Sequence, residues 1–276
     1  MKRRPRIVSA AGCAGLYPPN TLAGVQAALY HGADIVEVDV AITSDSKLIA
    51  RHNLRLNPGF DRDARGDWVK PPYAAIRDLT YAELQSIDVG RPRPGSHYER
   101  IFPEMSPLDG ARIPLVEEVI ATIAAAPAPP ILELELKSQA PELSPPPEVF
   151  AGAIAALYEE HKQRLPLAAS SFDWTLLAHL RSLARDLPIY LLAPEGLHER
   201  DCGGGALIER AKALNAATVG VYAFEADAAL VARAHDAGLE IMIWGLIDPF
   251  DPGEYLKAGV DAIVTVRPDL FRWGRP

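Results

Sequence analysis

The chain has 276 residues, a net charge of −8 and a hydrophobic content of 49%. This length suits one α/β barrel, which takes about 250 residues. Two cysteines, Cys13 and Cys202, are too few for a disulfide framework or a cysteine-based zinc site. The acidic balance argues against nucleic acid or an anionic membrane surface as the main partner, although a bound cation would still allow a phosphate substrate.

The start of the chain is basic, like the start of a signal peptide, but residues 7–12 are strand-like and Pro18 and Pro19 follow soon after. No apolar run approaches the roughly 20 residues that span a bilayer. We therefore expect a cytoplasmic protein without stable membrane insertion, unless a leader preceded residue 1. The sequence predicts no oligomeric state.

Short β-rich runs alternate with Ala- and Leu-rich helical segments, a pattern typical of a parallel sheet with crossover helices. Nine strands are predicted, at residues 6–9, 35–40, 48–52, 131–136, 167–171, 189–192, 217–221, 240–244 and 262–265. Residues 41–47 are too few for a parallel crossover, which needs about a dozen, so the second and third strands are predicted to form an antiparallel hairpin. The other eight strands predict one TIM-like (β/α)8 barrel domain over residues 1–276.

Helix signals fill the gaps between the strands. Asn20 is expected to N-cap a helix over residues 21–31, and Asp173 is expected to cap another over residues 174–184. A third helix, over residues 227–237, should end at Gly238. Residues 53–110 differ, because they are rich in Arg, Asp, Pro and Gly and carry one clear helix signal, at residues 80–84. We interpret this segment as a small insertion that caps one rim of the barrel.

Acidic residues alternate with apolar ones in two of the predicted strands. Glu37 and Asp39 share one face of the first, and Glu133, Glu135 and Lys137 share one face of the second. Buried carboxylates require a cation or a basic partner, and hard oxygen ligands suit Mg²⁺ or Ca²⁺. The alternative is a solvent-facing edge or an ion pair with Lys137. Two such strands in one barrel favour the metal.

Three further side chains could line a site. The predicted hairpin brings His52 back beside the acidic strand, where it could act as a general acid or base, or be a structural histidine bonded to backbone. Trp244 ends a predicted strand and could form a wall of the barrel mouth, or belong to the core. Cys13 is interpreted as a small residue in a tight turn. The glycine-rich stretch 202–205 lacks the lysine of a phosphate-binding loop.

Along nearly its whole length the chain resembles the glycerophosphodiester phosphodiesterase family, whose fold is a phospholipase C-like (PLC-like) phosphodiesterase barrel. The resemblance is carried by short motifs that occur in the family's order and spacing. They are the stretches 18–22 (PPNTL), 32–40 (GADIVEVDV), 51–53 (RHN), 77–80 (RDLT), 112–119 (RIPLVEEV), 133–137 (ELELK), 171–173 (SFD) and 259–265 (GVDAIVT).

The resemblance implies roles for the residues already singled out. Glu37, Asp39 and Glu135 resemble the family's metal ligands, and His52 resembles one of its two catalytic histidines. Lys137 resembles a lysine that helps to bind phosphate, and Trp244 matches an aromatic residue near the substrate. The implied activity is metal-dependent hydrolysis of a small-molecule phosphodiester, in which the two histidines transfer protons.

The sequence departs from the family pattern at several positions of the expected site. Ala10 and Ala11 stand where the family has His-Arg, so one catalytic histidine and a phosphate-binding arginine are replaced. Pro19 replaces a glutamate, Asn53 an aspartate, and Val266 the aspartate of a late Thr-Asp. Loss of one acid–base partner costs about 10²- to 10⁴-fold in rate, and loss of the arginine removes a charge-assisted phosphate contact.

Two functional hypotheses follow. The first is a working phosphodiesterase, acting on a glycerophosphodiester-like or a divergent substrate with an easier leaving group. The second is a catalytically impaired family member, a pseudoenzyme, that keeps the metal and binds a phosphodiester or a partner protein without normal turnover. Deliberate replacement of residues 10 and 11 by alanine is less favoured, because Cys13, Pro19 and Asn53 depart from the pattern as well.

Overall fold

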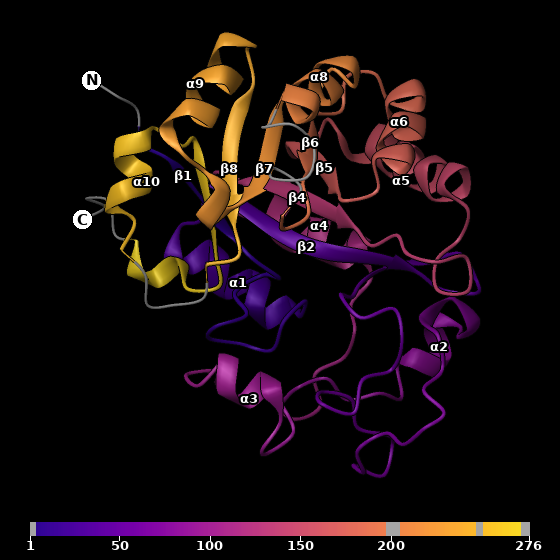
Figure 1. Ribbon diagram of the computed structural model, residues 1–276. Coiled ribbons are helices and arrows are strands. Elements are labelled where there is room, and N and C mark those ends of the chain that lie inside the picture. Colours follow the sequence, from indigo (N-terminus) through magenta and orange to yellow (C-terminus); the bar gives the residue numbers. More distant parts are fainter. Residues whose placement is uncertain (1–3, 197–204, 247–250, 272–276) are drawn as a thin grey trace.

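The computed structural model describes residues 4–196, 205–246 and 251–271 (Figure 1). Cys202 and most of the glycine-rich stretch lie outside the described residues. Eight parallel strands form a closed barrel, as the sequence predicted: β1 pairs with β2 on one side and with β9 on the other. The eight are β1 (Arg6–Ser9), β2 (Ile35–Ile42), β4 (Ile131–Leu136), β5 (Leu167–Ser171), β6 (Ile189–Leu192), β7 (Thr218–Tyr222), β8 (Glu240–Trp244) and β9 (Ala262–Thr265).

Alternation along the strands decides which side chains enter the barrel. In β2, Val36, Val38 and Val40 belong to the core between strands and helices, whereas Ile35 packs with residues of other strands in the interior. Glu37 and Asp39 lie on the same face as Ile35, because successive side chains point to opposite faces. In β4 the leucines 132, 134 and 136 likewise join the outer core, so Glu133 and Glu135 face inward.

Helices surround the strands in the expected alternation (Figure 1). The helices that cover the barrel are α1 (Leu22–His31), α4 (Val116–Ala124), α5 (Pro147–His161), α6 (Trp174–Leu183), α8 (Gly205–Ala213), α9 (Ala228–Asp236) and α10 (Gly253–Ala258). Short 3₁₀ turns occupy Ile76–Asp78, Ala223–Glu225 and Pro268–Leu270. The chain has no helix, within these described ranges, that is long and apolar enough to cross a membrane.

One predicted cap is wrong and another is confirmed. The hydroxyl of Thr21, not the amide of Asn20, caps α1 by accepting from the backbone N–H of Gly24 at 3.2 Å. Asn20 is engaged elsewhere, with Asp39, and therefore cannot serve the helix. The carboxylate of Asp173 caps α6 as expected, accepting from two backbone N–H groups.

The hairpin between the second and third strands is confirmed. β3 (Leu48–Ala50) runs antiparallel to β2, with Val40 opposite Ala50 and Ile42 opposite Leu48. β3 ends at Ala50, earlier than the predicted residue 52. The Arg51 N–H still donates to the Asp39 carbonyl at 2.8 Å, and the chain then leaves the sheet.

The segment between β3 and α4 lies over one end of the barrel and carries two short helices, α2 (Tyr81–Leu84) and α3 (His97–Ile101) (Figure 1). A capping box between Thr80 and Glu83 starts α2, which accounts for the helix signal in the sequence. Residues of this segment face Asp39 and residues that follow β1 and β9 across a cavity. The segment therefore covers the carboxyl ends of the strands, where barrel enzymes build their sites.

A buried ion pair anchors this segment to the barrel. Both terminal nitrogens of Arg51 donate to the carboxylate of Asp61, at 2.8 and 2.6 Å, and the side chain of Asp61 is fully buried. The same carboxylate accepts from the backbone N–H of Asn57 at 2.6 Å. Because Arg51 directly precedes His52, the pair also determines where His52 leaves the hairpin.

We expect Asp61→Ala to lower the free energy of unfolding by about 3–5 kcal/mol, because it leaves the Arg51 guanidinium buried without its partner. Urea denaturation followed by the fluorescence of Trp68, which lies in the segment, measures the change. Asp67→Ala is the matched control: its side chain lies 3.8 Å from exposed Arg65 and should leave the midpoint unmoved. Equal midpoints for Asp61→Ala and the unmodified chain would contradict the anchoring role.

Candidate functional site

The register of β2 and β4 brings the acidic residues together inside the barrel. Glu37 pairs with Glu133, and Asp39 pairs with Glu135. One carboxylate oxygen from each of Glu37, Asp39 and Glu135 lies within 4.8 Å of the other two. Glu37 and Asp39 are 7% and 4% exposed, so this cluster is largely removed from solvent.

Lys137 follows β4 and lies against two of these three carboxylates. Its Nζ is 2.8 Å from Asp39 Oδ1, and it also donates to Glu135 Oε1. Burial opposes the charge of the ammonium, but Asp39 and Glu135 raise the pKa of Lys137 above its usual value. If all four groups are ionised, two negative charges are left, which is the charge that one divalent cation neutralises.

Glu37 is the carboxylate that Lys137 leaves uncompensated. Its Oε2 accepts from the backbone N–H of Ala11 at 2.7 Å, but its buried Oε1 has no partner among the described residues. Burial, followed by repulsion from Asp39 and Glu135, raises the pKa of Glu37 well above its usual value. Burial acts on Asp39 in the same direction, yet the Lys137 ammonium lowers the pKa of Asp39 overall.

Asn20 orients Asp39. Its amide nitrogen donates to Asp39 Oδ2 at 2.7 Å, and its amide oxygen accepts from the Asp39 backbone N–H at 3.0 Å. Asn20 adopts a left-handed backbone with φ of 58°, a conformation that Asn tolerates better than most residues. The capping role predicted for Asn20 is thus replaced by this contact with Asp39. Its position in the PPNT motif, rather than any capping pattern, was the available signal.

The three carboxylates fit a hard divalent cation. Two ligand oxygens of one Ca²⁺ ion, each at about 2.3–2.6 Å from it, can be at most roughly 4.6–5.2 Å apart, and the three carboxylate oxygens lie within 4.8 Å of one another. The partnerless Glu37 Oε1 supplies an oxygen that no protein donor satisfies in the described structure. The ion pair that the sequence left open as the alternative is present too, but it accounts for Asp39 and Glu135 and not for Glu37.

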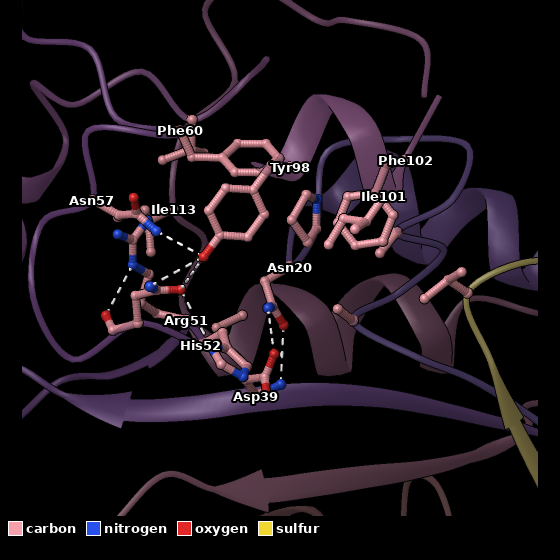
Figure 2. A pocket seen from close by; sticks show the side chains of 17 residues that line it. Asn20, Asp39, Arg51, His52, Asn57, Phe60, Tyr98, Ile101, Phe102 and Ile113 are labelled. Atoms are coloured by element: carbon pink, nitrogen blue, oxygen red, sulfur yellow. Dashed lines mark hydrogen bonds between the residues drawn. The ribbon is translucent and has the colours of Figure 1, made fainter. Parts of the chain in front are cut away.

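His52 lies just outside the acidic cluster. Its side chain is exposed, and its Nδ1 is 3.2 Å from Asn53 Oδ1. His52 and Asp39 both line a cavity of about 290 Å³ between the barrel and the segment that covers it (Figure 2). The predicted proximity of His52 to the acidic strand is therefore observed, and its exposure leaves the imidazole open to a ligand.

Tyr98 of α3 reaches back toward His52 from the covering segment. Its hydroxyl accepts from the amide of Asn57 at 2.8 Å and from that of Asn53 at 3.3 Å, as Figure 2 shows in part. The Phe60 ring packs against the Tyr98 ring edge to face, with centroids 4.8 Å apart. Of these residues only Asn53 was singled out from the sequence, because the segment has no periodic pattern that would mark Asn57, Phe60 or Tyr98. Its aromatic residues were the one available signal.

Two other inward residues lie apart from the cluster. Burial raises the pKa of Glu133 to about 7, and its Oε2 lacks a partner within the described ranges, but Glu133 is not one of the three clustered carboxylates. Trp244 packs against Phe172 and Tyr222, with ring centroids 5.3 and 5.2 Å away. The described lining of the His52 cavity does not include Trp244.

Known proteins share this sequence and architecture. The profile of the glycerophosphoryl diester phosphodiesterase family matches residues 11–270. A glycerophosphodiester phosphodiesterase of Caldanaerobacter subterraneus is 26% identical over 92% of this chain and 90% of its own. The solved structure of a Silicibacter pomeroyi protein that bears the family's name has a TM-score of 0.88 and 31% identity, over 96% of this chain and 90% of that one. A phosphodiesterase from Oleispira antarctica shows the same fold, with a TM-score of 0.70 and 22% identity over 96% and 94% of the two chains.

We expect Mg²⁺ or Ca²⁺ to raise the melting temperature of EDTA-treated protein, because a ligand that binds only the folded state stabilises it. Glu37→Gln should abolish this rise, since it removes the carboxylate that Lys137 does not neutralise. It should leave the metal-free protein at least as stable, because a buried charge is lost. Glu133→Gln is the control, because Glu133 precedes Glu135 by two residues on the same face of β4 and is not one of the three clustered carboxylates. This variant should keep the metal-induced rise in melting temperature. A metal response unchanged in Glu37→Gln would rule out this cluster as the cation site.

Proposed function

Because the chain belongs to the glycerophosphoryl diester phosphodiesterase family, we propose that it is a metal-dependent phosphodiesterase acting on a small-molecule phosphodiester. One observation carries the proposal: three clustered carboxylates, two of them buried and one of these, Glu37, uncompensated, lie beside a cavity that Asp39 and His52 line. The Oleispira antarctica phosphodiesterase was solved in complex with the product sn-glycerol-3-phosphate, which supports a small phosphoester as the ligand class.

Glu37, Asp39 and Glu135 are the residues that would hold Mg²⁺ or Ca²⁺. A cation bound there polarises a phosphoryl oxygen and stabilises the charge that develops on it. Asn20 holds Asp39 in place from one side, and Lys137 does so from the other. Lys137 also adds a positive charge next to the position where a phosphate would bind, as the family resemblance implies.

His52 is the proposed proton carrier. If its Nδ1 proton is donated to Asn53 Oδ1, as the 3.2 Å contact allows, Nε2 is the atom that exchanges a proton with the ester or the attacking oxygen. Ala10 stands where the resemblance implies the family's other histidine, so His52 would transfer protons without a second histidine. An easier leaving group, which needs less help from an acid, fits this arrangement better than a glycerophosphodiester does.

A second candidate function is binding without turnover. Two observations favour it. Lys137 already contacts two of the three carboxylates. Alanine also stands at positions 10 and 11, where the resemblance implies the residues that transfer a proton and contact phosphate. Such a protein would bind a metal ion and a phosphodiester, or a partner protein, at the same site. Turnover that depends on both the metal ion and His52 separates the two functions.

We expect His52→Asn to lower kcat/KM on an activated phosphodiester such as bis(4-nitrophenyl) phosphate by about 10²- to 10⁴-fold, the usual contribution of one general acid or base. Release of nitrophenolate measures the rate. His52 is exposed, so the substitution should leave the melting temperature unchanged. His97→Asn, on α3 and not part of the described cavity lining, is the control and should retain the activity. Because nitrophenolate leaves without help from an acid, this substrate reports on His52 as the base toward the attacking oxygen, and equal rates for both variants would disprove that role.

The paired substitution Ala10→His with Ala11→Arg should raise turnover of glycerophosphocholine by at least about 10²-fold, because it restores an acid–base partner and a charge-assisted phosphate contact. Release of choline measures the gain. Ala11→Arg alone is the control and should improve KM more than kcat. A pair with no gain over the unmodified chain would mean that more of the site differs from the family than these two positions.

A further inference from the structure

The cavity beside His52 differs in character from one end to the other. Asp39 belongs to the acidic cluster, and Figure 2 shows Asn20 and His52 beside it. Four further polar residues, Arg51, Asn53, Asn57 and Tyr98, also line the cavity. The apolar part of the wall consists of Ala11, Ala14, Pro19 and Val266 from the barrel side, and of Phe60, Val89, Ile101, Phe102 and Ile113 from the covering segment.

Most of the polar side chains in the lining are already engaged with one another. Both ends of the Asn20 amide bond to Asp39, and Arg51 is held by Asp61. The Tyr98 hydroxyl accepts from the amides of Asn57 and Asn53. A ligand hydroxyl pressed against the remaining wall would lose its water without gaining a partner, which costs about 1–3 kcal/mol for each group.

The size of the cavity suits a ring. Its volume is about 290 Å³, whereas an apolar cavity of about 150 Å³ is enough to bind benzene. Three lining residues, Ala11, Pro19 and Val266, also occupy positions where the family resemblance leads us to expect an arginine, a glutamate and an aspartate. Part of the apolar lining therefore adjoins the proposed metal site, where the resemblance leads us to expect charged side chains.

We propose that this cavity binds an aryl-sized apolar group of the phosphoester, so that the preferred substrates are phosphodiesters with an aromatic or similarly apolar ester group and not glycerophosphodiesters. The proposal rests on the proposed function, because the acidic cluster, Lys137 and His52 must hold the phosphoryl group at the polar end. The new proposal specifies the ester group that is attached to the phosphoryl group. Ile101 and Phe102 of the covering segment would contact this ester group.

Binding to the Mg²⁺-saturated protein tests the proposal independently of turnover. Phenylphosphonate, whose C–P bond resists hydrolysis, is compared with glycerol 3-phosphate by isothermal titration calorimetry. The two ligands share the phosphoryl end and differ in the group that would enter the cavity. Phenylphosphonate should bind at least about tenfold more tightly, because burying a ring in an apolar wall is favourable and burying unpaired hydroxyls is not.

The variant Ile101→Asn should lower phenylphosphonate affinity by about five- to tenfold and leave glycerol 3-phosphate affinity within about twofold. The second ligand thus reports whether the variant still folds. Leu183→Asn is the control, because Leu183 is 55% exposed on α6, and it should leave both affinities unchanged.

The failure of each proposal can be recognised separately. Equal or tighter binding of glycerol 3-phosphate, or no binding of either ligand, overturns the apolar ligand class, whatever the enzyme hydrolyses. Preferential binding of phenylphosphonate without hydrolysis of any phosphodiester supports the apolar ligand class and overturns the enzymatic function. An Ile101→Asn variant that binds both ligands like the unmodified chain also overturns the inference.

Discussion

The parallel register of β2 and β4 is the constraint on which the chemistry of this protein depends. It places Asp39 beside Glu135 and Glu37 beside Glu133, all on the face that points into the barrel. Burying ionised carboxylates is costly unless they are paired or coordinate a cation. The ammonium of Lys137 partly neutralises Asp39 and Glu135. Glu37 has one carboxylate oxygen for which the described residues supply no hydrogen-bond partner. With its carboxylates ionised the cluster would therefore carry an excess of negative charge, which a divalent cation would relieve.

The strands supply the cluster, but the segment between β3 and α4 supplies the space around it. The buried pair of Arg51 and Asp61 holds this segment to the end of the hairpin, and the residues next to the pair, His52 and Asn57, line the cavity. This division of labour is typical of (β/α)8 barrels, in which the loops at the carboxyl ends of the strands vary while the barrel persists. We therefore expect the side chains of this segment and of the turn after β1 to determine which ligand this chain prefers.

The relation to the glycerophosphoryl diester phosphodiesterase family has two parts. The first is shared: the family profile extends over residues 11–270, and the chain has the barrel and a cluster of three acidic residues. The second is the β1 turn, where Ala10 and Ala11 follow the strand and the resemblance leads us to expect His-Arg. Even so, the Ala11 backbone N–H still donates to Glu37. The turn can therefore support the carboxylate through its backbone, whereas the methyl side chains of Ala10 and Ala11 offer no group that could bind phosphate or transfer a proton.

The sequence by itself determined the barrel, the β2–β3 hairpin and the facing of the acidic residues. These features follow from local rules: alternation along a strand, the minimum length of a crossover and the pairing of a cap with its helix. They could be predicted because each involves residues a few positions apart. The same rules placed Glu37, Asp39 and Glu135 on inward faces, and the hairpin placed His52 near them.

The tertiary structure decided what those residues contact. Asn20 orients Asp39 and does not cap α1, and Lys137 lies between Asp39 and Glu135. The cavity wall joins Ala11 and Val266 to Ile101 and Phe102, residues from opposite ends and the middle of the chain. No periodic pattern marks such partners, because their proximity results from closing the barrel and folding an irregular segment over its mouth. The acidic cluster was thus readable in the sequence, and the shape and polarity of the space beside it were not.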